Sequence, residues 1–359
     1  MFQGYSLAAV AAVFIAAAAA IWYAGIRLVD ATDILDDRWR LGEALGGTLL
    51  LAIATNLPEL AITASAAWSG NVGVAVGNIL GGIAIQTVIL AVLDFRMQNG
   101  GPLTRRAASL PLILEGLAVV AILGVCIMAT QLPPSLIFDR LTPGPVLVAL
   151  VWIAGVWLIG RANEQSPADP SGEPGPGALQ AAWVDGTPSR RSSPSVSGGS
   201  TARAVWIFIG ASVVTLVAGV ILERASDVIA ERTGMSGVLF GATVLAAATA
   251  LPELSTGLRA IAKGDYRLAV SDIFGGNAFL PVLFLLATLL SGQAVLPRAS
   301  ESDIYLAGLG ILLTCVYLAG LVFRPSHRIT AARIGPDSLA ALVFYGVGMA
   351  GLCAMELAA

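Results

Sequence analysis

Two glutamates, Glu59 and Glu253, lie deep within long apolar segments of the sequence. A carboxylate in the hydrocarbon core of a bilayer costs about 2.5–3.5 kcal/mol on insertion scales, so such residues are rare and usually functional. Each directly follows a proline, in the matching segments Ala-Thr-Asn-Leu-Pro-Glu-Leu and Ala-Thr-Ala-Leu-Pro-Glu-Leu. Two structural carboxylates in matched contexts would be an improbable coincidence, so we expect the pair to face each other and act together.

The preceding prolines add oxygen ligands to these acids. Proline has no N–H, so the carbonyls of Ala54 and Ala248, four residues earlier, lose their helical partners. Irregular backbone at membrane depth is tolerated where it lines a cavity. Thr55 and Thr249 place a hydroxyl within the same turn of each segment. Two carboxylates with several neutral oxygens suit Ca²⁺, which takes about 6–8 oxygen ligands in flexible geometry.

The apolar segments that follow supply further candidate ligands. Asn78 and Gln86 lie in the first of them, and Asp272 lies in the second. The spacing leaves two interpretations of Asp272 open: a second proton or cation site, or a residue in water near the start of its helix. The glycine pairs 81–82 and 275–276 would allow neighbouring helices to approach closely.

The composition predicts an all-α membrane protein. Hydrophobic residues make up 57% of the 359 residues and charged residues 12%, about half the charged fraction of soluble domains. The first apolar run has no Lys or Arg before it, so we interpret it as a retained helix and not a secretory signal. Apolar runs long enough to span a bilayer predict ten transmembrane helices, near 5–28, 43–69, 72–94, 107–130, 143–160, 204–222, 237–262, 266–291, 303–323 and 338–356.

The basic residues predict the orientation of these helices. All but four of the 20 Lys and Arg residues follow odd-numbered helices; the exceptions are Arg140, Arg224, Arg232 and Arg298. The positive-inside rule then places both termini outside an inner membrane and the ends of the odd-numbered helices in the cytoplasm. A net charge of −3 without basic patches argues against a nucleic-acid partner, and the lipid bilayer and inorganic cations are the expected partners.

An internal repeat divides the chain. At an offset of 194, about 21 of 55 positions are identical between 28–82 and 222–276. The Pro-, Gly- and Ser-rich stretch 162–203 predicts a disordered cytoplasmic linker between two five-helix repeats, 1–161 and 204–359. Because five is odd, the repeats must be inverted, which is the architecture of secondary transporters with a site near the midplane.

At these residues the sequence resembles the sodium/calcium exchanger family, within the calcium/cation antiporter superfamily. The family pattern is Gly-Thr-Ser-x-Pro-Glu followed by Gly-Asn-x-x-Gly-Ser-Asn-x-x-Asn or Asp, once in each inverted half. The resemblance covers nearly the whole chain and implies that Glu59 and Glu253 coordinate Ca²⁺. It also implies flanking sodium sites at Thr55, Thr249, Asn56 and Gln86.

Several family positions differ in this sequence. Ala250 and Gly276 stand where the second half should carry serines, and Leu280 where it should carry Asn or Asp. The resemblance implies a secondary antiporter that exchanges Ca²⁺ for Na⁺. These differences leave H⁺ as the alternative counter-ion. An intramembrane enzyme is disfavoured because no nucleophile motif or cofactor fingerprint is found, and a non-transporting sensor or scaffold is a weaker alternative. No cofactor and no obligate protein partner are expected.

Overall fold

The computed structural model describes residues 2–39, 54–97, 101–133, 141–165, 201–329 and 333–358. Within these ranges the chain is helical apart from turns and an isolated bridge between Ile329 and Ile334. The helices and helical turns are α1 (Leu7–Trp39), α3 (Leu57–Ser69), α4 (Val72–Arg96), α5 (Leu103–Ala107), α6 (Leu110–Thr130), α7 (Pro143–Gln165), α9 (Thr201–Thr233), α10 (Gly237–Phe240), a π-helical turn (Gly241–Leu245), α11 (Ala246–Thr249), α12 (Leu251–Lys263), α13 (Tyr266–Phe279), a 3₁₀ turn (Leu280–Val282), α14 (Leu283–Ser291), a second 3₁₀ turn (Leu296–Arg298), α15 (Glu301–Phe323) and α16 (Pro336–Ala358).

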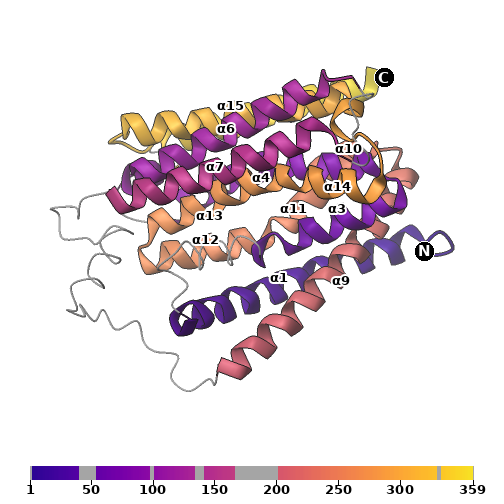
Figure 1. Cartoon of the computed structure of the whole chain (residues 1–359), viewed down its shortest axis with the longest axis horizontal. Helices are drawn as coiled ribbons and strands as arrows, with labels where there is room; N and C mark the ends of the chain where they lie inside the picture. Colours follow the sequence, from indigo (N-terminus) through magenta and orange to yellow (C-terminus); the bar gives the residue numbers. More distant parts are fainter. Residues whose placement is uncertain are drawn as a thin grey trace.

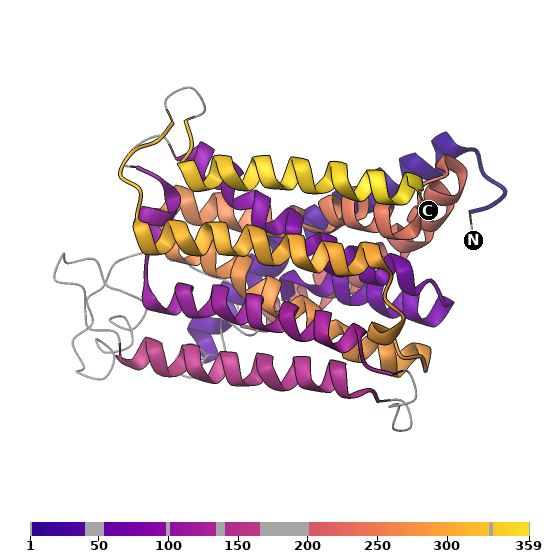
Figure 2. The ribbon, with the colours of Figure 1, turned by 90° about the horizontal axis from the view of Figure 1, so that it is seen from above.

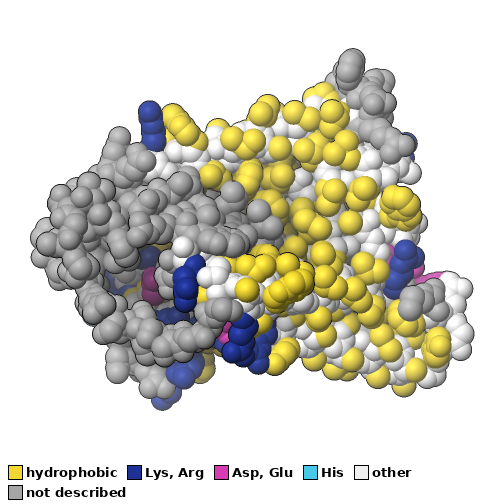
Figure 3. All heavy atoms as spheres, turned by 60° about the horizontal axis from the view of Figure 1, so that its bottom comes forward, with side chains coloured by type: hydrophobic (Ala, Val, Ile, Leu, Met, Phe, Trp, Pro, Cys, Tyr) yellow, Lys and Arg dark blue, Asp and Glu magenta, His cyan; other side chains and the backbone are white. Residues whose placement is uncertain are grey.

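The prediction of an all-helical membrane protein is confirmed. Within the described ranges, eight helices are long and apolar enough to cross a bilayer, and a bent pair, Gly237–Thr249 with Leu251–Lys263, would make nine. Apolar side chains cover most of the body seen in Figure 3, and Lys and Arg gather toward its two ends. The arrangement of ten helices in two inverted repeats remains a prediction, because the predicted second helix, 43–69, begins before residue 54, where the described range starts. Most of the predicted linker, 162–203, likewise lies outside the described residues.

Two helices are longer than their apolar runs predict. α1 continues to Trp39 and α9 to Thr233, against predicted ends near 28 and 222. Arg38 and Arg232 therefore lie in the last turns of these helices and not in loops. The prediction was wrong here because hydropathy marks only the part of a helix that hydrocarbon can cover, whereas the backbone hydrogen bonds can continue into water.

The helices pack in layers along one common direction (Figure 1). α1 packs along α9, and these two helices, here called the α1–α9 layer, contact the rest of the chain mainly through α3 and α12. α4 and α13 lie beyond α3 and α12. Figure 2 shows α16, α15, α6 and α7 side by side over the opposite face. We call the end next to residues 165 and 201 the linker end and the other the terminal end.

Glycines allow α4 to pack backbone to backbone against the segment 237–245. A Cβ atom built on Gly81 would lie 2.2 Å from the Cα of Ala242, and one on Gly77 would lie 2.6 Å from the carbonyl oxygen of Val238. The segment that faces them contains the π-helical turn, a feature often found at functional sites. Only glycine fits such a close approach, so α4 is fixed in register against this segment.

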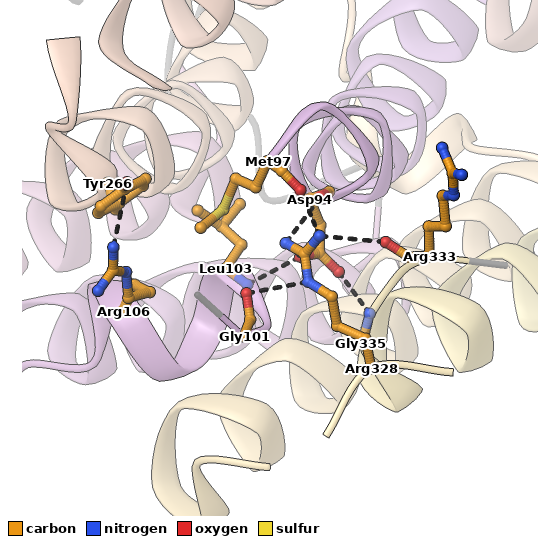
Figure 4. Close-up of polar contacts among 9 residues, drawn as sticks. All are labelled: Asp94, Met97, Gly101, Leu103, Arg106, Tyr266, Arg328, Arg333 and Gly335. Atoms are coloured by element: carbon orange, nitrogen blue, oxygen red, sulfur yellow. Dashed lines mark hydrogen bonds and ion pairs between the residues drawn. The ribbon is translucent and has the colours of Figure 1, made fainter. Parts of the chain in front are cut away.

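A polar cluster holds the loops at the linker end (Figure 4). The buried carboxylate of Asp94, on the last turn of α4, accepts hydrogen bonds from the amides of Leu103 (2.9 Å) and Gly335 (2.6 Å). It also pairs with Arg328 at 3.1 Å, whose guanidinium donates to the Gly101 carbonyl at 3.0 Å. A buried charge is tolerated when it is paired and hydrogen-bonded in this way, so Asp94 joins two loops that are distant in sequence.

The α4 contact predicts a large difference between two substitutions of the same kind. Gly81→Val should lower thermal stability in detergent markedly, because overpacking a tight contact typically costs about 1–3 kcal/mol. Gly124→Val on α6 is the matched control, since a Cβ atom there would meet nothing within 4 Å. Equal melting temperatures for the two variants would contradict the close packing of α4 on 237–245.

Candidate functional site

Two helix breaks create the candidate site. α3 begins at Leu57 after Asn56, and α12 begins at Leu251 after Ala250. Each helix carries its proline in the first turn, where a missing N–H costs nothing. α11 and α12 meet at 42°, so the single helix predicted at 237–262 is in fact a broken one.

The backbone has the same arrangement at both breaks. The amide of Leu60 donates to the Asn56 carbonyl at 3.0 Å, and the amide of Leu254 donates to the Ala250 carbonyl at 3.1 Å. Pro58 and Pro252 cannot donate to the carbonyls four residues before them, which belong to Ala54 and Ala248. Both alanines are buried, so the predicted neutral oxygens lie inside the protein at matched positions.

The two glutamates lie in the interior of the molecule, within electrostatic reach of each other. Glu59 and Glu253 are both 0% exposed, and their carboxyl groups are near enough to repel each other. Thr249 lies beside the Glu59 carboxyl group, and Asp272 lies near Glu253. Among the described residues, no hydrogen bond of ordinary geometry reaches the carboxyl oxygens of either glutamate. Such a buried pair requires a cation or protons to offset its charge.

A second group of polar side chains lines the neighbouring helices. A Cβ atom on Gly276 would lie 3.3 Å from Oε1 of Gln86 and 3.5 Å from Nδ2 of Asn56, so α13, α4 and the first helix break meet at this glycine. The Asn56 amide also reaches the Thr55 hydroxyl at 3.5 Å. Asn78 is buried, but its backbone faces Gly241. The structure thus groups Asn56, Thr55 and Gln86, and gives no contact of the Asn78 side chain with them.

Two interactions near the site involve residues to which the sequence pattern gave little weight. The hydroxyl of Ser271, the residue directly before Asp272, donates a hydrogen bond to Glu115 of α6 at 2.9 Å. The amide of Asn277 donates to the Thr87 hydroxyl at 3.1 Å and joins α13 to α4. An acid within an apolar helix was the available signal for Glu115, but its partner is distant in sequence and could not be read from it.

The ligand chemistry available here is that of a hard cation. Within the described ranges, no three Asp, Glu, His or Cys side chains have the geometry to hold one metal ion. A cation bound at Glu59 and Glu253 would therefore complete its shell with neutral oxygens, such as hydroxyls, amides and carbonyls. Ca²⁺ accepts such mixed oxygen shells.

The contacts of the α1–α9 layer repeat at the offset of 194. A Cβ atom on Gly25 of α1 would lie 2.9 Å from the Cβ of Pro252, and one on Gly219 of α9 would lie 3.1 Å from the carbonyl oxygen of Pro58. Each half of the chain thus places a glycine of its long helix against the proline of the other half. The two helix breaks are consequently covered by equivalent surfaces.

Comparison with known proteins agrees with this architecture. The sequence profile described as sodium/calcium exchanger protein matches residues 9–161 and 203–353. CaxA of Alkalimonas amylolytica, which is named as an antiporter, is 26% identical over 305 residues, or 84% of this chain and 88% of that protein. The inner membrane protein YrbG of Escherichia coli K12 is 25% identical over 310 residues, or 85% of this chain and 86% of that protein.

Solved structures share the fold at low sequence identity. Native YfkE has a TM-score of 0.59 at 15% identity and covers 94% of this chain and 91% of its own. The sodium–calcium exchanger NCX_Mj has a TM-score of 0.58 at 16% identity, with 95% and 97% covered. The H⁺/Ca²⁺ exchanger CAX has a TM-score of 0.56 at 12% identity, with 98% and 95% covered. Because the family profile spans both halves, the chain belongs to the sodium/calcium exchanger protein family.

Proposed function

We propose that this chain is a secondary antiporter that exchanges Ca²⁺ for Na⁺ across the inner membrane. The observation that carries the proposal is the burial of two carboxyl groups, Glu59 and Glu253, within electrostatic reach of each other at two matched helix breaks. One divalent cation balances two such charges. Family membership supports cation exchange, and the finer assignments to ion and residue are our proposal.

Ion competition at this pair would couple the two fluxes. Ca²⁺ binds between the carboxylates, with neutral oxygens from Thr249 and from the carbonyls of Ala54 and Ala248. Na⁺ ions occupy the flanking oxygens of Thr55, Asn56 and Gln86, with Asn78 and Asp272 as further ligands, and they displace Ca²⁺ by sharing the same glutamates. No covalent bond is made or broken. Each ion excludes the other, so movement in one direction requires movement in the other.

Alternating access would expose the bound ions to one side at a time. Inverted repeats commonly provide this by rocking or sliding one unit against another around a fixed midplane site. The repeated contacts of Gly25 with Pro252 and Gly219 with Pro58 support such a symmetry here. With a Na⁺ gradient directed into the cell, this exchange would move Ca²⁺ outward.

Proton coupling is the second candidate, favoured by the residues at the family's sodium positions. Ala250, Gly82, Gly276 and Leu280 offer no side-chain oxygen where the family pattern has serine, Asn or Asp. Protons would then discharge the buried acids when Ca²⁺ leaves. A non-transporting sensor would keep the Ca²⁺ site without coupled flux.

Flux measurements in proteoliposomes test the exchange. We expect Ca²⁺ uptake to follow an outward Na⁺ gradient, and Glu253→Gln and Glu59→Gln each to reduce it at least about tenfold, since contacts to a charged group are worth about 1.5–3 kcal/mol. Glu301→Gln, at an exposed position on α15, is the control and should retain uptake. Uptake that follows a pH gradient and ignores Na⁺ would select the proton mechanism, and uptake with neither gradient would exclude antiport.

Calcium binding can be measured without transport. Ca²⁺, but not Mg²⁺, should raise the melting temperature of the wild-type protein in detergent, because a ligand at about 100 times its Kd adds about 2.7 kcal/mol to the folded state. The increase should shrink as the pH falls, since protons compete with Ca²⁺ for the same carboxyl oxygens. Glu59→Gln and Glu253→Gln should abolish the increase, and Glu301→Gln should keep it. A full Ca²⁺ response in Glu253→Gln would show that the site is elsewhere.

A further inference from the structure

Two polar contacts tie the α1–α9 layer to the broken helices of the site. Toward the terminal end, the hydroxyl of Ser65 on α3 donates to Oε2 of Glu223 on α9 at 2.8 Å. At the linker end, Arg259 on α12 forms an ion pair with Asp30 on α1. These are called here the terminal tie and the linker tie.

The two ties occupy equivalent places in the repeat. Ser65 and Arg259 are 194 positions apart, which is the offset of the repeat, and Asp30 and Glu223 differ from that offset by one residue. In both ties a site helix of one half contacts the long helix of the other half. The side chains themselves are unrelated, since one tie is Ser–Glu and the other Arg–Asp. The two halves thus have a polar contact at equivalent places, but with different side chains.

The ties lie on opposite sides of the candidate site. Ser65 follows Glu59 by six residues, and Arg259 follows Glu253 by six, which is about 9 Å along a helix. α3 runs from the site toward the terminal end and α12 from the site toward the linker end (Figure 1). In this structure both ties are formed and both glutamates are buried. The structure therefore has one such contact in place on each side of the acid pair.

The strength of the linker tie suits a contact that opens repeatedly. The side chains of Asp30 and Arg259 are 48% and 39% exposed, and exposed ion pairs typically shift an equilibrium by no more than about fivefold. Glu223 is buried, and its second partner is its exposed neighbour Arg224 at 3.2 Å. Next to the ties, the layer meets the site helices through Gly25 and Gly219, small surfaces over which packed helices can slide.

We propose that the Asp30–Arg259 and Ser65–Glu223 contacts are the two gates of this exchanger. Each tie closes one end of the path to the acid pair, and transport requires the two to open in turn. This inference rests on the proposed antiport function. It assigns the gating contacts to four residues that lie outside the ion-binding motifs.

Crosslinking each tie tests the gates. Cys126, Cys315 and Cys353 are first replaced by Ala, and cysteine pairs are then placed at Asp30 and Arg259 or at Ser65 and Glu223. The full-length protein in proteoliposomes is treated with a short, reducible bifunctional thiol reagent, and Ca²⁺ exchange is measured before and after reduction. We expect crosslinking of either pair to reduce exchange at least about tenfold, because a gate that cannot open blocks every cycle. Reduction should restore the rate.

The chain offers a matched control for each tie. Ser302 of α15 donates to Glu356 of α16 at 2.6 Å, a second Ser–Glu contact near the terminal end. At the linker end, the Arg106 guanidinium of α5 lies 4.9 Å from the centre of the Tyr266 ring of α13. Neither control pair involves the α1–α9 layer. Cysteine pairs crosslinked at these two places should leave exchange within about twofold of the reduced rate, as expected for independent sites.

A charge swap tests the linker tie without crosslinking. Asp30→Arg alone places two cations together and should slow exchange, and the double variant with Arg259→Asp should restore it to within about twofold. Unchanged exchange after crosslinking a tie, or equal losses in the control pairs, would overturn the gating proposal while leaving antiport intact. A wild-type protein that exchanges no cation under either a Na⁺ or a proton gradient would overturn the antiport function, and the gates with it.

Discussion

Two buried carboxyl groups within electrostatic reach of each other impose the main constraint on this structure. Glu59 and Glu253 are removed from water, and negative charges on both would repel each other. A low-dielectric interior strengthens that repulsion, so the pair can persist only where positive charge is supplied to it. The broken helices follow from the same need, because a continuous helix would consume every backbone carbonyl in its own hydrogen bonds.

Duplication explains how one short motif could build the proposed cation site. A single Pro-Glu segment supplies one carboxylate, but two copies that face each other supply a pair that balances a divalent cation. The contacts around the breaks follow the same logic. Gly25 covers Pro252, and Gly219 covers Pro58, so each half shields the site helix of the other. The free-energy cost of burying the acids is thus offset by contacts between the two halves, which neither half could form alone.

The surroundings of the acid pair are less symmetrical than its centre. Asp272 lies near Glu253, and Glu115 is joined to Ser271, whereas the equivalent positions in the other half are Asn78, Leu309 and Gly77. The two long helices also end beyond their apolar runs and contact the site helices through chemically different ties. The two halves therefore surround the acid pair with different chemistry.

The site helices show which features of the site can be predicted from a few consecutive residues. The Glu pair, Thr249 and the freed carbonyls of Ala54 and Ala248 were predicted because proline chemistry and a buried charge are properties of a few consecutive residues. The sequence predicted that Gln86 and Asn56 belong to one site, but not that both lie against Gly276. The π-helical turn at Gly241–Leu245 was not predicted, since it depends on the close approach of Gly81 from α4.

The membrane class, the repeat offset and the identity of the paired acids can be predicted from the order of residues alone, because hydropathy, spacing and proline act along the chain. Which surfaces contact each other could be seen only in the folded chain. Asp94 contacts Arg328 and Gly335, and Glu223 accepts a hydrogen bond from Ser65. The partners in each case are more than 150 residues apart in the sequence. Such partners are selected by the packing of whole helices against one another, which depends on the complete set of contacts and not on any local segment.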